Sequence, residues 1–251
     1  MRFLASMLLL CIAASSLNAV EKVVTSTVRY ASGKDSVSSY LSVPEGRGPF
    51  PAIIVIHEWW GLNDWVEENA RDLASQGYVT LAVNLYRGKS TDSPDEAHEL
   101  MRGLPEDRAA RDLIAASEFL KGRSDVIRKK IGAIGWCMGG GYSLVTALNV
   151  PSLASCVICY GRLITDSASI AKIPCPILGI FGEEDRGISP QSVRDFEAAC
   201  KALGKNIDVK IYPSVGHAFM NSHNAKGYRK KESANAQKLI EKFFAKTLGK
   251  E

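Results

Sequence analysis

Short apolar runs recur along the chain and alternate with segments in which the apolar residues follow a helical period. The runs are typical of strands, most of them buried on both faces: 52–56, 79–83, 131–135, 154–159, 177–181 and 207–211. The helix-like segments are 65–76, 105–121, 139–148, 190–203 and 225–248. Strands that alternate with helices indicate parallel crossover units. The pattern therefore predicts an α/β fold, with a mostly parallel sheet and helices on both faces.

The residues ahead of the first of these runs have a different pattern. Segments 22–30 and 36–43 are expected to form two strands, joined across the turn-like Ser32-Gly33-Lys34-Asp35. This arrangement predicts an N-terminal antiparallel hairpin. Because no repeat, low-complexity stretch or linker divides the rest of the chain, residues 20–251 are expected to form one domain.

The first nineteen residues have the features of an export signal. Met1 and Arg2 form a short positive start, residues 3–14 are apolar, and Ala19 is a small residue suited to cleavage. We interpret residues 1–19 as a signal peptide cut after Ala19, the alternative being a buried N-terminal helix. The mature protein is then expected to be exported, either to the periplasm or out of the cell. No later segment has the about 20 apolar residues of a membrane span, so no span is expected after cleavage.

The composition is that of an ordinary globular protein. Of 251 residues, 46% are hydrophobic and 23% are charged, which excludes a disordered chain and a small disulfide scaffold. The net charge is +4 and the basic residues are spread along the chain, so a nucleic-acid partner is not expected. The one dense basic cluster, Lys226 with residues 229–231, is interpreted as a solvated helix face.

Five cysteines follow the predicted cleavage site, an odd number that leaves at least one thiol unpaired in an oxidising compartment. Cys156 and Cys159 have the C-x-x-C spacing of a redox pair. They lie in an apolar run, however, where their side chains would point to opposite faces of a strand, whereas redox pairs lie at a helix N-terminus. We therefore interpret them as buried structural cysteines.

Ligands of open α/β sheets bind at the carboxyl ends of the strands, which directs attention to the residues after each run. The run 131–135 is followed by Gly135-Trp136-Cys137-Met138-Gly139, which opens a helix. This is the spacing of a nucleophile elbow, with a cysteine in the usual serine position. The helix dipole favours a thiolate at this position. The alternative is a glycine-rich packing turn with an incidental cysteine.

A nucleophile needs a base, and the base needs an orienting carboxylate. Asp185 follows the run 177–181, and His217 follows the run 207–211. The chain order of nucleophile, acid and histidine is that of α/β hydrolases. The neighbouring Glu183 and Glu184 remain alternatives to Asp185 at this point.

A fourth strand end carries Glu58, followed by Trp59 and Trp60. The acid could be a solvated loop residue. The two tryptophans beside it indicate the wall of a pocket instead.

With these four loops, the sequence resembles the dienelactone hydrolase family of α/β hydrolases from about residue 26 to the C-terminus. The resemblance implies the α/β-hydrolase fold and a triad of Cys137, Asp185 and His217. It also implies that Glu58 helps to deprotonate the thiol when substrate binds. The backbone N–H groups of Met138 and Trp59 would form the oxyanion hole.

The resemblance extends to substrate-binding residues. In Leu85-Tyr86-Arg87, the arginine would bind a substrate carboxylate, with Tyr86 and Trp60 lining the same pocket. The alternative is that Arg87 lies on a surface loop and points to water. The second carboxylate-binding arginine of the family prototype falls four residues after the histidine, where this chain has Asn221. We therefore expect neutral esters to compete well as substrates. Export is a second departure from a typically cytosolic family.

The expected function is hydrolysis of a small-molecule ester or lactone through a thioester on Cys137. No metal or organic cofactor is implied, because the sequence has no H-E-x-x-H motif and no cysteine–histidine cluster. Two alternatives come from other classes: a non-catalytic binding protein that kept the fold, and a thiol redox protein built on Cys156 and Cys159.

Overall fold

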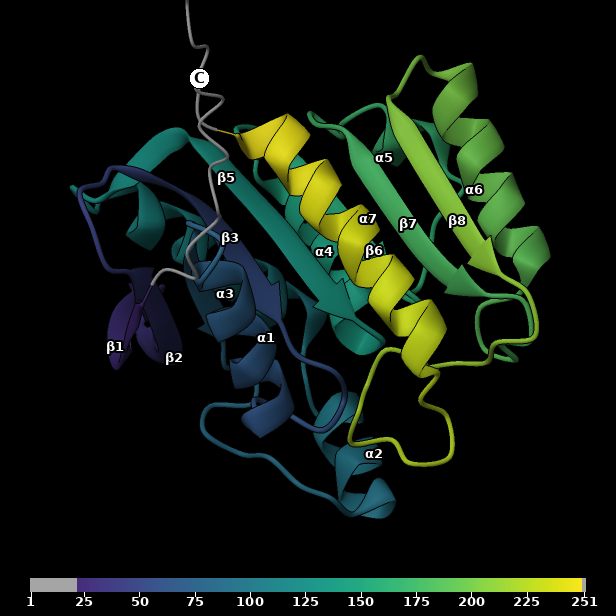
Figure 1. Ribbon diagram of the computed structural model, residues 1–251, viewed down its shortest axis with the longest axis horizontal. Helices are drawn as coiled ribbons and strands as arrows, with labels where there is room; N and C mark the ends of the chain where they lie inside the picture. The colour runs from purple at the N-terminus through teal and green to yellow at the C-terminus, as the bar shows by residue number, and fades with distance from the viewer. Residues whose placement is uncertain (1–21, 250–251) are drawn as a thin grey trace, which may run out of the picture.

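The computed structural model describes residues 22–249, so the predicted signal peptide lies outside the described residues. A single eight-stranded sheet, in the order β1-β2-β4-β3-β5-β6-β7-β8, forms the centre of the protein (Figure 1). Its strands are β1 (Val23–Ser32), β2 (Asp35–Pro44), β3 (Phe50–Ile56), β4 (Val79–Val83), β5 (Val126–Trp136), β6 (Ser155–Cys159), β7 (Ile177–Gly182) and β8 (Ile207–Tyr212). From β4 to β8 the pairs are parallel, whereas β1 and β2 pair antiparallel with each other and β2 with β4. The predicted hairpin and mostly parallel sheet are confirmed.

Helices cover both faces of the sheet, as predicted; α7 crosses the near face and α4 lies behind it (Figure 1). The helices are α1 (Asp64–Ala74), α2 (Pro94–Arg102), α3 (Glu106–Lys121), α4 (Met138–Asn149), α5 (Ser167–Ile170), α6 (Pro190–Ala202) and α7 (Lys230–Leu248). Every residue of β3, β4, β6 and β7 is buried between the two helical layers. Strand β8 alternates between buried and more exposed positions, because it lies at the edge of the sheet.

One helix boundary and one additional helix differ from the sequence pattern for local reasons. Helix α7 begins at Lys230 rather than near residue 225, because Asn224 organises a turn that accepts the N–H groups of Gly227 and Tyr228. Helix α2 was absent from the expected elements. It buries only Ala97, so it gives almost no apolar period to detect.

The N-terminal hairpin is fastened to the rest of the fold through one buried acid. Asp112 of α3 is fully buried and accepts hydrogen bonds from Ser32 Oγ at 2.5 Å and from Arg87 Nη2 at 2.8 Å. Arg87 also donates to the carbonyl of Ser36 in β2. The hairpin is thereby connected to the loop that follows β4.

Among residues 22–249, no helix is both long enough and apolar enough to cross a membrane.

Candidate active site

Cys137 occupies a sharp turn between β5 and α4. Its backbone has a φ of 56°, a conformation that costs energy in a residue other than glycine and that is typical of functional sites. A Cβ on Gly135 would lie 2.1 Å from the carbonyl oxygen of Gly139, and one on Gly139 would lie 2.3 Å from that of Ile56. Only glycine fits at either position. The G-x-C-x-G spacing is therefore required by the close approach of α4 to β3 and β5.

Asp185 lies in the loop after β7, and three hydrogen bonds hold its carboxylate in a fixed arrangement. Its Oδ1 accepts the backbone N–H groups of Gly187 at 2.8 Å and Ile188 at 3.0 Å, and its Oδ2 lies 2.6 Å from His217 Nδ1. Burial opposes ionisation, but these hydrogen bonds, that of His217 first, hold the pKa of Asp185 below its usual value. Of the three neighbouring acids, Asp185 is buried against the histidine, whereas Glu183 and Glu184 are exposed.

His217 follows β8 and lies between Asp185 and Cys137. Burial alone would lower its pKa, but hydrogen bonds to Asp185 and Cys137 outweigh burial and raise the pKa to about 10. Because Nδ1 is bonded to Asp185, the other ring nitrogen, Nε2, is the one available to the thiol. The structure thus brings together the three residues that the sequence selected as nucleophile, base and acid.

The other buried histidine has a structural position. His57 donates from Nδ1 to the carbonyl of Glu58 at 2.6 Å and accepts the N–H of Leu85 at Nε2. Burial lowers its pKa to about 4, so it is neutral and both its nitrogens are occupied.

Glu58 lies at the end of β3, buried beside the histidine. Asn221 Nδ2 donates to its Oε2 at 2.6 Å, and the Tyr160 hydroxyl donates to its Oε1 at 3.3 Å. Burial raises the pKa of Glu58 to about 7, although both hydrogen bonds and the nearby His217 act in the opposite direction. The solvated-loop alternative for Glu58 does not fit a carboxyl group that is 2% exposed.

Tyr160 and Asn221 belong to this cluster, although the sequence did not single them out as partners of Glu58. Tyr160 follows β6, has a φ of 39°, and its ring centroid lies 5.2 Å from that of His217. Its place at a strand end is the same signal that found the other four loops. Asn221 stands at the position of the prototype's second carboxylate-binding arginine. The structure instead commits its amide to Glu58 and to the N–H of His223.

The two candidate oxyanion donors lie where β3 ends against the start of α4. Met138 is the first residue of α4, so its N–H has no acceptor within the helix. Gly139 packs on the carbonyl groups of Ile56 and His57, which brings Trp59 near the same turn. The Tyr86 hydroxyl lies 3.2 Å from Met138 Sδ and is therefore close to the cysteine as well.

Three aromatic side chains lie together beside the candidate oxyanion donors. The rings of Trp59 and Trp60 are 4.6 Å apart, and His98 of α2 meets the Trp59 ring edge-on at 4.7 Å. Both tryptophans are partly exposed, which agrees with their expected position on a pocket wall.

Arg87 does not join the other candidate residues. Its guanidinium group pairs with the fully buried Asp112 at 2.8 Å, lies 3.7 Å from Asp35, and donates to the Ser36 carbonyl. Arg87 was expected to bind a substrate carboxylate, but in the structure it is paired with a buried carboxylate of the protein itself. Moving Arg87 to substrate would leave Asp112 buried and unpaired, which would be costly.

Within residues 22–249, no group of three or more histidine, cysteine, aspartate or glutamate side chains could hold a metal ion.

Comparison with known proteins places the chain in a family. The model of the dienelactone hydrolase family matches residues 37–248. The chain belongs to the dienelactone hydrolase family. A relative from Methylorubrum extorquens, named as a candidate carboxymethylenebutenolidase, is 30% identical over 222 residues, which cover 83% of this chain and 76% of the relative. The chain is therefore a hydrolase, as the resemblance implied.

Solved structures establish the fold. A dienelactone hydrolase-like promiscuous phosphotriesterase from metagenomic libraries has a TM-score of 0.84 at 22% identity, covering 90% of this chain and 99% of that one. A candidate dienelactone hydrolase from Klebsiella pneumoniae has a TM-score of 0.82 at 23% identity, covering 89% and 99%. These likenesses confirm the α/β-hydrolase fold.

Proposed function

We propose that this hydrolase cleaves esters or lactones through a covalent thioester on Cys137, with His217 as base and acid and Asp185 as the orienting carboxylate. One observation carries the proposal. The cysteine sits at positive φ on a strand-to-helix turn, hydrogen-bonded to a histidine that is itself fixed at 2.6 Å by a buried aspartate. This is the arrangement of an activated nucleophile, its base and the group that orients the base.

In the acylation step, the thiolate of Cys137 attacks the carbonyl carbon of the substrate and the proton of the thiol resides on His217 Nε2. A carbon–sulfur bond forms, and the carbonyl electron pair moves to oxygen. The backbone N–H groups of Met138 and Trp59 stabilise this oxyanion. When the tetrahedral intermediate collapses, the carbon–oxygen bond breaks and the alkoxide takes the proton from His217. The acyl group remains on Cys137 as a thioester.

In the deacylation step, neutral His217 accepts a proton from water at Nε2 while the water oxygen attacks the thioester carbon. The second tetrahedral intermediate breaks its carbon–sulfur bond and releases a carboxylic acid. Cys137 returns as a thiolate and His217 as an imidazolium ion. Asp185 accepts the hydrogen bond from the Nδ1–H of His217 in both steps, so the ring keeps the orientation that both steps need.

Glu58 supplies a second acceptor for the thiol proton of Cys137. When His217 already carries its own proton, the ionised Glu58 carboxylate takes the thiol proton as substrate enters, which leaves a thiolate beside the imidazolium. A pKa of about 7 lets the carboxyl group both accept and release a proton near neutral pH. Asn221 and Tyr160 position this carboxyl group beside the nucleophile and base, and they act through it rather than on substrate.

A thiol redox protein fits the structure less well. Cys156 and Cys159 lie within β6, fully buried, and burial raises the pKa of each thiol well above its usual value. A redox pair needs an accessible thiolate. No observation favours this alternative over hydrolysis.

Export of the enzyme remains part of the proposal and rests on the pattern of residues 1–19. Expression of the full chain in a bacterial host, followed by fractionation and N-terminal sequencing, tests it. We expect an exported protein that begins at Val20. An uncleaved chain retained in the cytoplasm would contradict it.

The function is tested with the purified mature protein on p-nitrophenyl esters and simple lactones. Cys137→Ala should reduce hydrolysis to background, because the covalent step has no substitute atom. Cys175→Ala, which removes a buried thiol elsewhere, is the matched control and should keep its activity. If Cys137→Ala kept more than about a tenth of kcat, a loss below about 1.4 kcal/mol, the assignment of the nucleophile would be wrong. Absence of hydrolysis in the wild type would favour the binding-protein alternative.

A further inference from the structure

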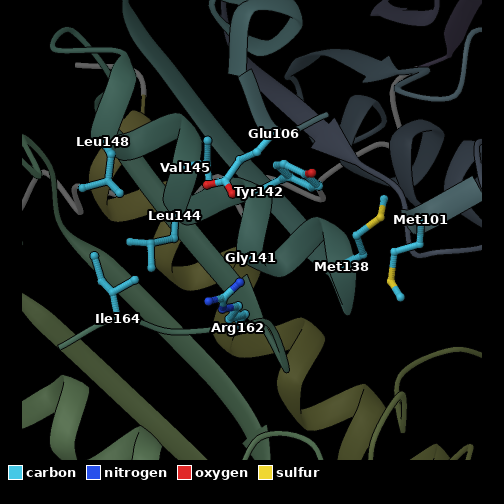
Figure 2. A pocket seen from close by; sticks show the side chains of 10 residues that line it. All are labelled: Met101, Glu106, Met138, Gly141, Tyr142, Leu144, Val145, Leu148, Arg162 and Ile164. Atoms are coloured by element: carbon cyan, nitrogen blue, oxygen red, sulfur yellow. The ribbon is translucent and has the colours of Figure 1, made fainter. Parts of the chain in front are cut away.

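A groove of about 380 Å³ runs along the outer face of α4 and begins next to the proposed nucleophile. Figure 2 shows Met101 and Met138 at one end and Leu148 and Ile164 at the other, with Leu144 and Val145 between them. Met138 directly follows Cys137, so this end of the groove lies at the residue next to the proposed nucleophile. Its volume lies within the range of small-molecule binding pockets.

The walls of this groove are mostly apolar, and its two charges balance. Arg162 and Glu106 both contribute to the lining, and both residues are exposed. One cation and one anion give the groove no net charge. An uncharged apolar group therefore gains from burial there, whereas a carboxylate would meet Glu106 as well as Arg162.

The two places where a substrate carboxylate was considered offer no available cation. Arg87 is held by Asp112, Asp35 and the Ser36 carbonyl on the side of the N-terminal hairpin. Asn221, an uncharged residue at the second position, is buried and bonded to Glu58. At these two positions a carboxylate-bearing lactone would lose its hydration without an opposite charge in return.

We propose that the substrates are uncharged esters or lactones with an unbranched apolar chain, and that this chain lies in the groove along α4. This inference rests on the proposed function, since it places the chain relative to the carbonyl that Cys137 attacks. Met138 and Leu148 are ten positions apart on α4, and each position rises by about 1.5 Å, so the groove is about 15 Å long and suits an acyl chain of medium length.

The test compares p-nitrophenyl acetate, butyrate, hexanoate and octanoate with p-nitrophenyl hydrogen adipate, which ends in a carboxylate. Each buried methylene should raise kcat/KM by up to about fourfold. The hydrogen adipate, with six acyl carbons like the hexanoate, should react at least about tenfold more slowly than the hexanoate.

Two variants test where the acyl chain of the substrate lies. Val145→Phe fills the middle of the groove and should lower the octanoate-to-acetate ratio of kcat/KM by about tenfold or more. Asn149→Phe adds the same ring at an exposed position of α4 and should leave that ratio unchanged. If Val145→Phe folds poorly, Leu148→Ser removes apolar surface at the far end and should lower the rate with octanoate more than with butyrate.

The outcomes separate this inference from the proposed function. Hydrolysis of acetate without a gain for longer chains, or a preference for hydrogen adipate, would overturn the inference and leave the Cys137 mechanism standing. An unchanged ratio in Val145→Phe would also overturn it. No hydrolysis of any ester or lactone would overturn the proposed function and the inference together.

Discussion

Two acids lie near His217, Asp185 and Glu58, and the protein gives them opposite properties. Both are buried. Asp185 receives two backbone N–H groups and the histidine, and its pKa is lowered. Glu58 receives one amide and one hydroxyl group, and burial raises its pKa to about 7. The comparison shows that burial alone does not decide the charge of a carboxyl group, because the number and charge of its donors decide whether burial is outweighed.

The largest effect expected from this comparison is at Asp185. Asp185→Asn removes the charge that raises the pKa of His217 and favours the wrong ring tautomer, so kcat should fall by about 10³-fold or more. Glu184→Gln, in the same loop but exposed, should behave like the wild type. Steady-state kinetics on one ester measures kcat for both variants and for the wild type. A rate within a few-fold of wild type in Asp185→Asn would remove Asp185 from the mechanism.

Glu58 should show a smaller effect with a different pH signature. Glu58→Gln keeps the shape of the side chain but cannot accept a proton, so acylation should slow by about 10²-fold. In the wild type, kcat/KM should fall as the pH is lowered through about 7, because Glu58 becomes protonated. The variant should lack this fall. Pre-steady-state release of p-nitrophenol measures acylation, and a wild-type rate in the variant would refute an active role for Glu58.

Replacing Asn221 should shift the pH dependence of kcat/KM without abolishing it. Its hydrogen bond lowers the pKa of Glu58 against the effect of burial. Asn221→Leu removes the bond, so the acidic fall in kcat/KM should shift to higher pH, and activity at neutral pH should drop by about tenfold. Recovery at high pH distinguishes positioning from simple damage to the fold. A lower rate with an unshifted profile would count against a positioning role.

Tyr160 should give the smallest effect of the four. Its hydroxyl group donates to Glu58 over 3.3 Å, a longer bond than that of Asn221 at 2.6 Å. Tyr160→Phe should therefore shift the same pH profile in the same direction, with a loss of about threefold at neutral pH. A larger shift than that of Asn221→Leu would reverse this ranking of the two donors.

The strand ends explain how much of the site could be predicted from the sequence. Cys137, Asp185, His217 and Glu58 each follow an apolar run, and parallel strands bring their carboxyl ends to one edge of the sheet. The apolar pattern therefore predicted both the sheet and the edge at which these residues meet. Tyr160 follows the same rule, but a tyrosine after a buried run carries no obvious chemistry until its partner is known.

Arg87 shows what the local pattern could not predict. Its loop position and its resemblance to a carboxylate-binding arginine are both local properties. Its partner, Asp112, lies 25 residues away on α3, in a helical stretch whose buried acid looks in sequence like any polar helix position. Pairing between distant elements depends on packing, which periodicity does not report.

The attachment of the N-terminal hairpin to the rest of the fold has a consequence for residues distant from strands β1 and β2. Arg87, held at a φ of 58° by Asp112 and the hairpin, directly follows Tyr86, whose hydroxyl group touches Met138. Strands β1 and β2 are thus connected, through Arg87 and Tyr86, to Met138 at one end of the groove, although they lie at the far edge of the sheet from β8. If esters bind in the groove as proposed, insertions, deletions or proteolytic cleavage in this hairpin should change which esters the protein hydrolyses. The N-terminal strands are therefore a place where evolution can retune selectivity while the catalytic residues stay fixed.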